Sequence, residues 1–328
     1  MSGALPPPNK VFVGDCLRTM NGWAGQFVDL VFADPPYNIG YKYDQYNDSR
    51  SGDDYVQWTE DWIDQCARVL KPTGSLYVLI GDEYAAEIRL HLKRLEAAGS
   101  LQFRNWIVWH YTFGQNCRTK FNRSHAHLFY CVGSAALAGK WKQSAPPFTF
   151  NRDQIAIPSA RQTAYSDARA NPKGKLPDDT WYLRPQETNG DFFHPDQDTW
   201  VESRLCGTFR ERVGWHPCQL PEALLERIVQ LSSRAGDLVF DPFVGSGTTL
   251  AVAARLQRNW LGCELSTDYA RRARQRIRHS HTTGETLKTG QKEKGIERGK
   301  PKKKAEPHRS PHLRSPKGRG KSGPGGNK

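Results

Sequence analysis

Short apolar runs alternate along this chain with longer segments in which apolar residues recur every three or four positions. The runs predict β-strands at residues 10–13, 28–33, 75–80, 105–111, 126–132, 238–240 and 260–264. The periodic segments predict helices at residues 53–70, 83–98, 221–233, 248–256 and 266–277. We expect Lys71-Pro72-Thr73-Gly74 to end the first long helix. The alternation predicts the doubly wound α/β class, a mostly parallel Rossmann-like sheet with helices on both faces.

Two segments fall outside this alternation. Residues 139–213 have little regular apolar pattern, and a segment of that length inside a compact domain is usually an insertion or functional. Residues 281–328 hold 14 Lys and Arg against 4 Asp and Glu and almost no apolar side chains, a composition typical of disorder. We therefore expect one domain built from residues 9–138 and 214–280, with an insertion between them and a disordered basic tail after them.

Charge and cysteine content indicate the kind of partner and the compartment in which the protein works. The net charge is +13, of which the tail carries +10, so a polyanionic partner is expected, nucleic acid before membrane, with a merely solubilising tail as the alternative. The first ten residues contain three prolines and no apolar signal region, and no apolar run reaches the roughly 20 residues of a membrane span. The seven cysteines form no Cys-x-x-Cys pair, so we expect no metal site and a reducing, cytoplasmic compartment.

A glycine-rich turn, Asp241-Pro242-Phe243-Val244-Gly245-Ser246-Gly247-Thr248-Thr249, joins a predicted strand to a predicted helix. Glycines let the backbone approach a ligand closely. A phosphate-binding P-loop is excluded because no Lys follows Gly247, and Leu250 stands where a dinucleotide fingerprint requires a third glycine. Glu264 ends the next strand, where it can accept hydrogen bonds from ribose hydroxyls. These features favour a nucleoside ligand without a pyrophosphate, with an ordinary tight turn as the alternative.

A second motif, Asp34-Pro35-Pro36-Tyr37, comes directly after the strand predicted at 28–33. Two prolines fix the backbone and remove two N–H donors, which leaves a carboxylate, the Pro35 carbonyl and an aromatic face. Asp34 and that carbonyl can each accept one N–H of an amino group on a flat ring, while Tyr37 stacks on the ring. A simple strand-terminating turn is the alternative interpretation.

Together the two motifs resemble those of the S-adenosylmethionine-dependent amino-methyltransferases of DNA, and their order resembles the circularly permuted beta group, which contains adenine-N6 and cytosine-N4 enzymes. Supporting matches are Gly14-Asp15, Gly262-Cys263-Glu264 and His216-Pro217-Cys218-Gln219-Leu220-Pro221. The last departs from the usual His-Pro-Thr-Gln-Lys-Pro at Cys218 and Leu220. The resemblance covers roughly residues 9–132 and 214–280.

The resemblance implies a methyltransferase domain whose catalytic half is 9–138 and whose cofactor-binding half is 214–280, separated by a target-recognition insertion. It implies that the methionine part of S-adenosylmethionine is surrounded by Phe243, Gly245, Gly247 and Thr248, with Asp241 near its amino group. Glu264 would bind the ribose hydroxyls, and Asp15 would lie near the adenine edge. The target-base pocket and the catalytic role would belong to Asp34, Pro35, Pro36 and Tyr37.

The resemblance further implies site-specific methylation of adenine N6 in double-stranded DNA, since Asp at the position of Asp34 leans towards adenine and Ser towards cytosine N4. The target atom is hidden in the duplex, so the base has to be flipped out. DNA would be the partner of a nucleoid-associated enzyme. Alternatives are cytosine N4, an RNA amine, a non-catalytic nucleic-acid-binding protein on this scaffold and, disfavoured by Leu250 and the two prolines, a nicotinamide oxidoreductase. Oligomeric state and pairing with a restriction enzyme, as in restriction-modification systems, stay open.

The insertion holds a basic and aromatic set suited to reading DNA, namely Trp141, Lys142, Arg152, Arg161, Arg169, Lys173, Lys175, Trp181, Tyr182 and Arg184. An irregular insertion that these aromatics anchor is an equal alternative. His125 and His127 alternate on a predicted strand, and such a pair without a third ligand is more often structural than metal-binding. Cys218 is interpreted as a packing residue, and the helical spacing of Tyr55, Trp58 and Trp62 predicts core positions.

Overall fold

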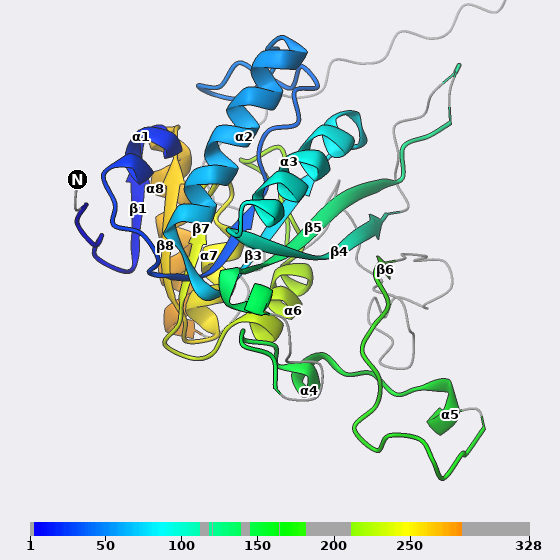
Figure 1. Cartoon of the computed structure of the whole chain (residues 1–328). Coiled ribbons are helices and arrows are strands. Elements are labelled where there is room, and N and C mark those ends of the chain that lie inside the picture. The colour runs from blue at the N-terminus through cyan, green and yellow to red at the C-terminus, as the bar shows by residue number, and fades with distance from the viewer. Residues whose placement is uncertain are drawn as a thin grey trace, which may run out of the picture. The chain divides into compact units, whose positions relative to one another are not determined.

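The computed structural model of the chain describes residues 3–111, 118–119, 121–138, 145–163, 165–181 and 211–283. Within them, one eight-stranded sheet has the order β1 (Lys10–Val13), β8 (Asn259–Glu264), β7 (Leu238–Asp241), β2 (Val28–Ala33), β3 (Leu70–Ile80), β5 (His125–Gly133), β4 (Leu101–His110) and β6 (Thr180–Trp181). Neighbours from β1 to β3 are parallel, β5 is antiparallel to β3 and β4, and β6 is parallel to β4. The predicted mostly parallel α/β sheet is confirmed (Figure 1).

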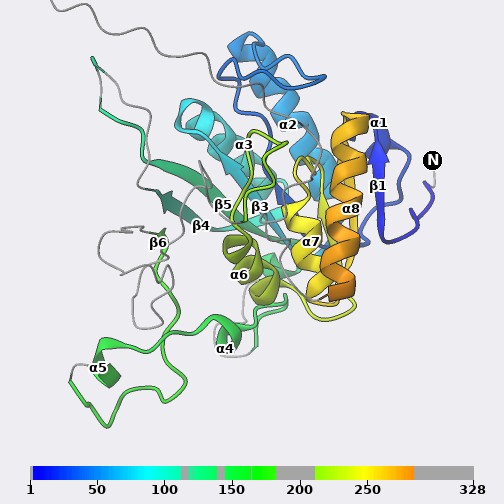
Figure 2. The same cartoon turned by 180° about the vertical axis from the view of Figure 1, so that it is seen from behind.

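Helices cover both faces of the sheet, because successive side chains of a strand point to opposite sides. The helices are α1 (Cys16–Asn21), α2 (Gly52–Val69), η1 (Asp82–Tyr84), α3 (Ala85–Ala97), η2 (Ser134–Ala138), α4 (Arg152–Ile155), α5 (Ala160–Thr163), α6 (Glu222–Ser232), α7 (Thr248–Arg255) and α8 (Thr267–Thr283). Val31 and Ala33 of β2 pack with α1, α2 and α3, whereas Leu30 and Phe32 pack with α6 and α7. Figure 2 shows α8 beside α7 on this second face. None of the described helices has the length and apolarity to cross a membrane.

The helix α2 ends at Val69, just before Lys71–Gly74 as expected, but the next strand begins at Leu70 and not at Ser75. Val28 of β2 already pairs with Leu70, and the pairing then shifts so that Leu30 faces Ser75. The residues between bulge out of the register, with Lys71 Nζ 2.7 Å from Asp29 Oδ1. The segment therefore belongs to β3, because the residues on either side of it, Leu70 and Ser75, both pair with β2.

The insertion is more ordered, where it is described, than its composition predicted. It contains α4, α5 and the short β6, whose pairing with β4 adds a strand to the main sheet. Residues 182–210 lie outside the described residues, and with them Tyr182 and Arg184; Trp141 and Lys142 do so as well. The last helix also runs further than the predicted end at 277, to Thr283, and the rest of the basic tail lies outside the described residues.

Candidate functional site

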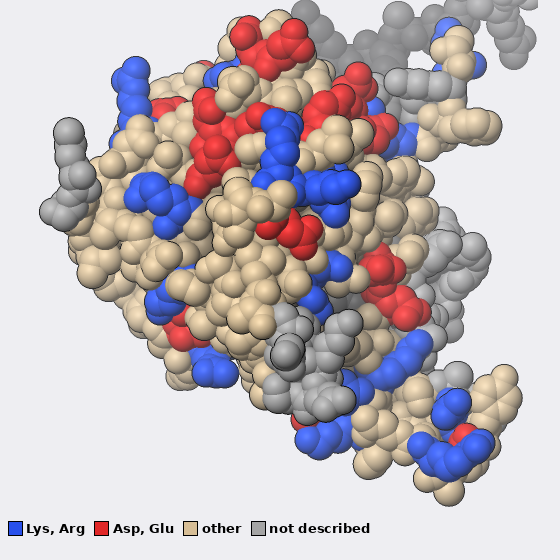
Figure 3. Space-filling model, in the orientation of Figure 1, with Lys and Arg blue, Asp and Glu red and all other residues tan. Residues whose placement is uncertain are grey.

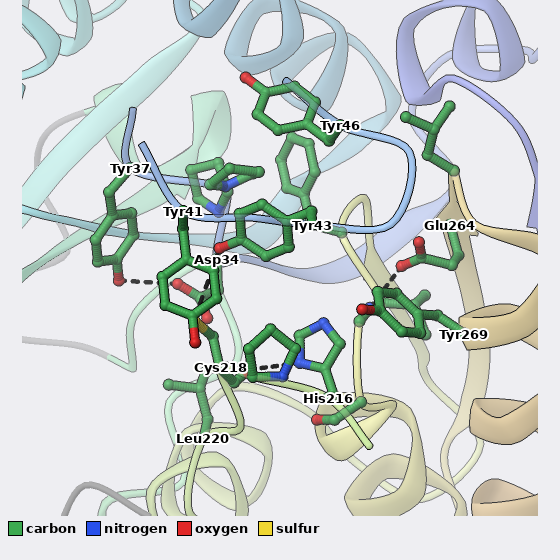
Figure 4. A pocket seen from close by; sticks show the side chains of 18 of the residues that line it. Asp34, Tyr37, Tyr41, Tyr43, Tyr46, His216, Cys218, Leu220, Glu264 and Tyr269 are labelled. Atoms are coloured by element: carbon green, nitrogen blue, oxygen red, sulfur yellow. Dashed lines mark hydrogen bonds between the residues drawn. The ribbon is translucent and has the colours of Figure 1, made fainter. Parts of the chain in front are cut away.

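A cavity of about 570 Å³ lies at the carboxyl ends of the parallel strands, the edge at which such sheets bind ligands. It is lined by residues at or just after the ends of β1, β2, β7 and β8 and by the segment 216–220 before α6. Of the predicted site residues, all except Gly247 line it: Asp15, Asp34, Pro35, Pro36, Tyr37, Asp241, Phe243, Gly245, Thr248 and Glu264. Motifs from opposite ends of the domain therefore share one chamber (Figure 4).

The turn after β2 is held by two tyrosine hydroxyls. Tyr37 donates to Asp34 Oδ1 at 2.8 Å, and Tyr55 of α2 donates to the Pro36 carbonyl at 2.7 Å. The ring of Tyr37 lies against Gly81, where a Cβ would come within 3.4 Å of it. Tyr55, predicted as a core residue, is indeed buried, and it also fixes the backbone of the turn that carries Asp34.

The hydroxyl of Tyr37 stays protonated in this setting. Its burial and the neighbouring Asp34 carboxylate raise the pKa of Tyr37 well above the usual value. The group therefore acts as a donor to Asp34 at every physiological pH. A carboxylate has about four acceptor positions, of which Tyr37 uses one.

The turn after β7 is fixed through its backbone. The buried Asp241 carboxylate accepts the N–H of Phe243 at 2.9 Å, and Val244 donates to the Cys263 carbonyl of β8 at 3.0 Å. The ring of Phe243 rests on Trp58 and Trp62 of α2, with centroids 5.6 and 5.1 Å away. The helix that anchors the first turn thus supports the second as well.

Glu264 closes the second turn against β8. Its Oε2 accepts the N–H of Gly245 at 2.8 Å, and its Oε1 accepts the N–H of Ser266 at 2.9 Å. Gly245 has φ 49°, and a Cβ there would lie 2.9 Å from His216 Cε1. Both the backbone conformation and the close approach of His216 require glycine.

Gly247 is the predicted site residue that does not line the cavity. It precedes α7 with φ 79°, and a Cβ there would lie 3.0 Å from the Cβ of Ala273 on α8. It lies behind the cavity wall rather than in it. Its missing side chain lets α7 and α8 pack closely.

Burial shifts the protonation of the carboxyl groups on this side of the cavity. It raises the pKa of Asp241 to about 7, with hydrogen bonds from Thr249 and Phe243 opposing the shift and the charge of Glu264 adding to it. It also raises the pKa of Glu264, against the backbone N–H groups of Ser266 and Gly245. A cation bound here would restore both charged forms. This wall therefore suits a cationic ligand.

Asp15 is the N-cap of α1 as well as a lining residue. Its Oδ1 accepts the N–H of Arg18 at 2.9 Å, and the preceding Gly14 donates to the Glu264 carbonyl at 2.9 Å. The capping bond fixes the carboxylate at the cavity edge beside the end of β8.

A loop that the sequence patterns did not single out, residues 38–51, forms another wall of the cavity. The buried carboxylate of Asp48 organises it by accepting the N–H groups of Asn38, Ile39 and Tyr41 at 2.8, 3.1 and 2.9 Å. Asn38 adopts φ 57°, a conformation that Asn tolerates better than most residues. One signal was available: three tyrosines at 41, 43 and 46 in an otherwise polar stretch directly after the first turn.

This loop is fastened to both sides of the cavity. Tyr43 donates to Cys218 Sγ at 3.7 Å, and Asp44 accepts the hydroxyl of Ser266, next to Glu264, at 2.5 Å. In Figure 4 Tyr43 lies between Asp34 and Tyr37 on one side and Glu264 on the other. Cys218 is therefore a lining residue and a hydrogen-bond acceptor, not only a packing residue.

The segment before α6 adds a neutral histidine. His216 Nδ1 donates to the Cys218 carbonyl at 2.9 Å, and its ring meets that of Tyr269 edge-on at 4.9 Å. Burial lowers the pKa of His216 to about 4. The ring packed against Gly245 is thus uncharged at neutral pH.

Basic side chains are found on the part of the molecule that carries α4 and α5 and also on α3, where Lys93 and Arg94 are exposed. Figure 3 shows Lys and Arg over the lobe that carries α4 and α5, whereas Asp and Glu gather over α2 and α3. Part of the basic set is paired inside the lobe, as Lys173 is with Asp153 and Arg169 with Asp167. The lobe still presents exposed cations such as Arg161 and the half-exposed Arg152.

His125 and His127 lie on β5 with ring centroids 4.9 Å apart. His127 Nδ1 accepts the indole N–H of Trp106 at 2.9 Å, and His125 lines the cavity. Among the described residues, no three His, Cys, Asp or Glu side chains are grouped as a metal site would require. His125 thus belongs to the cavity wall on the side of β4 and β5.

Comparisons with known proteins agree with this geometry. A family model described as DNA methylase, N6_N4_Mtase, matches residues 28–275. The type II methyltransferase M.HpaI of Haemophilus parainfluenzae is 30% identical over 268 residues, 82% of this chain and 74% of that protein. The DNA adenine methyltransferase YhdJ of Escherichia coli (strain K12) is 31% identical over 296 residues, 86% and 87% of the two chains.

Solved structures share the fold. The complex of M1.HpyAVI with S-adenosylmethionine has a TM-score of 0.51 and 21% identity, with 82% of this chain and 98% of that one covered. The cytosine-N4-specific PvuII DNA methyltransferase has a TM-score of 0.52 and 16% identity, with 86% and 93% covered. At these identities the likeness concerns the fold, and it confirms the expected Rossmann-like methyltransferase sheet.

Proposed function

Because the chain belongs to the N6_N4_Mtase family of DNA methylases, we propose that it transfers a methyl group from S-adenosylmethionine to the N6 amino group of adenine in DNA. The observation that carries the proposal is the meeting of two turns in one cavity. One presents Asp34 and Tyr37, and the other presents Gly245 beside Glu264. The first suits an amino group on a flat ring, and the second suits a cationic nucleoside.

On the base side, Asp34 and the Pro35 carbonyl would each accept one N–H of the target amine. These bonds favour a pyramidal nitrogen whose lone pair is localised, and the rigid turn holds it in line with the methyl group. The nitrogen then forms a bond to the methyl carbon while the carbon–sulfur bond breaks and its electron pair stays on sulfur. The extra proton leaves the methylated nitrogen along its hydrogen bond to Asp34. No covalent nucleophile is required.

On the other side, the residues present fit S-adenosylmethionine. The raised pKa of the buried Asp241 matches a site for the cationic amino group, and the missing side chain of Gly245 lets His216 pack against the turn. Phe243 and Thr248 would complete the wall around the methionine part. Glu264 would receive the ribose hydroxyls and Asp15 the adenine edge. Gly247 would act indirectly, by letting α7 and α8 pack behind the turn.

Adenine is proposed as the target rather than cytosine for two reasons. Asp34 occupies the first position of the catalytic turn, and a relative matched over 86% of this chain and 87% of its own length is named a DNA adenine methyltransferase. The likeness to a cytosine-N4-specific enzyme concerns the fold alone. Cytosine N4 is therefore an outcome that a direct assay of the product distinguishes.

DNA would bind across the basic lobe with the target base flipped into the cavity. In this proposal residues 9–138 and 214–280 form the two halves of the methyltransferase domain, and 139–213 read the sequence. The basic residues after Thr283 would bind phosphates without sequence preference. Removing residues 284–328 should then lower affinity for all DNA sequences alike and flatten its dependence on salt. A change in sequence preference would contradict this role of the tail.

The direct test is to incubate the protein with labelled S-adenosylmethionine and genomic DNA that lacks methylation. Mass spectrometry of the digested nucleosides should find N6-methyladenine, and sequencing should place it in one context. N4-methylcytosine would overturn the adenine assignment. Label in RNA alone would overturn DNA as the substrate, and no label in any nucleic acid would overturn the activity.

A further inference from the structure

Arg276 and Glu222 form a buried ion pair next to the turn after β7. The side chain of Arg276 on α8 is only 2% exposed and that of Glu222 at the start of α6 only 5%, and Arg276 Nη2 donates to Glu222 Oε1 at 2.6 Å. Burying a guanidinium is unfavourable unless its charge is paired and its N–H groups are bonded. The other bonds of the two side chains show what such a pair holds in place.

Arg276 holds the turn that lines the cavity. Its Nη1 donates to Thr248 Oγ1 at 2.9 Å and to the Ser246 carbonyl at 3.2 Å. The hydroxyls of Ser246 and Thr248 are 2.9 Å apart, and both residues line the cavity, whereas Arg276 does not. The guanidinium therefore bonds the turn on both sides of Gly247, at Ser246 and Thr248, without lining the cavity itself.

Glu222, the partner of Arg276, lies next to the segment 216–220, which forms another wall of the cavity. It lies two residues after the segment 216–220, which brings His216 against Gly245. Its N–H donates to Glu211 Oε1 at 2.7 Å, and its Oε2 lies 3.3 Å from Arg255 Nη2 of α7. Figure 2 shows α6, α7 and α8 next to one another on this face. The spacing of the two cavity walls is therefore set through one buried carboxylate.

We propose that Arg276 and Glu222 are positioning residues for S-adenosylmethionine. Together they fix the turn at Ser246–Thr248 at the distance from the segment 216–220 that the ligand requires. The inference rests on the proposed function, because it takes that molecule as the occupant of the cavity. It concerns binding and not the chemical step, since neither side chain reaches the turn that carries Asp34.

Position 276 requires arginine because its planar guanidinium carries several N–H donors, which can bond two partners at once. One nitrogen bonds the turn while the other bonds Glu222, a geometry that the single ammonium of lysine cannot reproduce. Arg276→Lys should keep the buried charge paired and lose the grip on Thr248 and Ser246. We expect the Kd for S-adenosylmethionine to rise about tenfold, roughly the loss of one charge-assisted hydrogen bond.

The decisive variant replaces both partners, Arg276→Met with Glu222→Leu. Apolar replacement of a buried ion pair often preserves stability, and Arg255, the other partner of Glu222, keeps Glu226 at 3.6 Å. The double variant should therefore melt near the wild-type temperature and still bind S-adenosylmethionine at least tenfold more weakly by calorimetry. Its kcat at saturating S-adenosylmethionine should stay near that of the wild type while KM rises. Arg274→Lys is the matched control on the same helix, because the side chain of Arg274 bonds the Val11 carbonyl of β1 and not the turn, and its affinity should not change.

A folded double variant with wild-type affinity would overturn the proposal, and so would a fall in kcat with unchanged KM. If the double variant does not fold, the same two readouts on Arg276→Lys decide, since that variant keeps the ion pair. A wild-type protein that fails to bind S-adenosylmethionine would overturn the proposed function itself. A wild type that binds it, with variants that bind equally well, would overturn only the role of the pair.

Discussion

The same dipeptide, Asp-Pro, ends two neighbouring strands of the sheet and serves two different purposes. On β2 it is Asp34-Pro35, whose carboxylate is partly exposed to the cavity and bonded by the side chain of Tyr37. On β7 it is Asp241-Pro242, whose carboxylate is buried and bonded by the backbone N–H of Phe243 and by the side chain of Thr249. The first carboxylate faces the cavity, where it can exchange hydrogen bonds with a substrate. The second is buried and holds its own turn in place.

The residue after each dipeptide produces this difference. A second proline after Pro35 removes an N–H, so the first turn cannot fold its backbone onto Asp34. Phe243 after Pro242 supplies that N–H, and its ring rests on two tryptophans of α2. Substitutions in the first turn should therefore change chemistry, and substitutions in the second should change ligand binding and stability together.

The largest effect is expected from Asp34→Ala. Loss of the acceptor that positions the target amine should lower kcat by roughly a thousandfold, the scale seen when one preorganised polar group is removed from an active site. Affinity for S-adenosylmethionine should stay within about twofold in calorimetry, because Asp34 lies outside the second turn.

Asp34→Asn gives the matched control, since it keeps the shape of the side chain and removes the charge. It should be nearly as inactive as the alanine variant and equally stable. Turnover near that of the wild type in either variant would remove Asp34 from the mechanism. Weakened binding of S-adenosylmethionine in both would mean that the two turns are not separable.

The next largest effect is expected from Gly245→Val in the second turn. The new side chain would meet His216, 2.9 Å from the position of a Cβ, on a backbone at φ 49°. Affinity for S-adenosylmethionine should fall at least tenfold, and the free energy of unfolding should fall by about 1–3 kcal/mol through strain. Calorimetry and thermal unfolding measure the two effects.

Gly99→Val is the control that separates backbone strain from a clash of the new side chain with His216. Gly99 has a similar positive φ of 78°, but no atom of the described residues lies within 4 Å of a Cβ there. This variant should lose stability and keep its affinity for S-adenosylmethionine. Equal affinities in the Gly245 and Gly99 variants would show that Gly245 does not adjoin the ligand.

Short-range patterns were sufficient to predict seven of the eight described strands, the long helices and the two turns, but not β6. Asp34, Asp241 and Glu264 each stand at the end of an apolar run, and parallel strands bring such ends to one edge. Successive side chains of β2 point to opposite faces of the sheet, so that Val31 packs towards α2 and Leu30 towards α6. These features depend on neighbours in the sequence, which is why they could be predicted.

Features that depend on distant partners could not be predicted. The loop 38–51 is fastened by Tyr43 to Cys218 and by Asp44 to Ser266, contacts between segments far apart in the chain. Arg276 reads as one of several arginines on α8 until Glu222 is placed beside it. Gly247 matched a motif, yet its neighbour proved to be Ala273 of another helix. A pattern of residue types along the chain does not show which distant residues these side chains contact.

A smaller and pH-dependent effect should arise from Asp241. Burial raises the pKa of Asp241 to about 7, above its ordinary value near 4, so the folded protein without ligand favours the protonated form. Its contribution to stability should therefore be lost as the pH rises from about 4 to about 7 and be constant above. A cationic ligand favours the carboxylate, so affinity for S-adenosylmethionine should rise up to about tenfold per pH unit below 7 and level off above it.

Calorimetry between about pH 5.5 and 8.5, a range that brackets this pKa, in buffers of different ionisation enthalpy, would detect the release of that proton on binding. Asp241→Asn should bind more weakly and lose the pH dependence, while Asp34→Asn should retain it. A pH dependence that persists in Asp241→Asn would assign the titrating group to another residue and remove the contrast between the two carboxylates.

The smallest effect is expected from Tyr37→Phe. The hydroxyl donates to Asp34 at 2.8 Å, so its loss would leave that carboxylate less firmly oriented, while the ring that we propose stacks on the base remains. The kcat should fall by about threefold to tenfold, or about 0.7–1.4 kcal/mol, because the hydrogen bond orients Asp34 and does not itself contact the amine. Tyr37→Ala removes the ring as well and should lower kcat/KM for DNA further, since base stacking contributes about 1–3 kcal/mol. If the two variants were equally active, the ring would not touch the base, and the first turn would act through Asp34 alone.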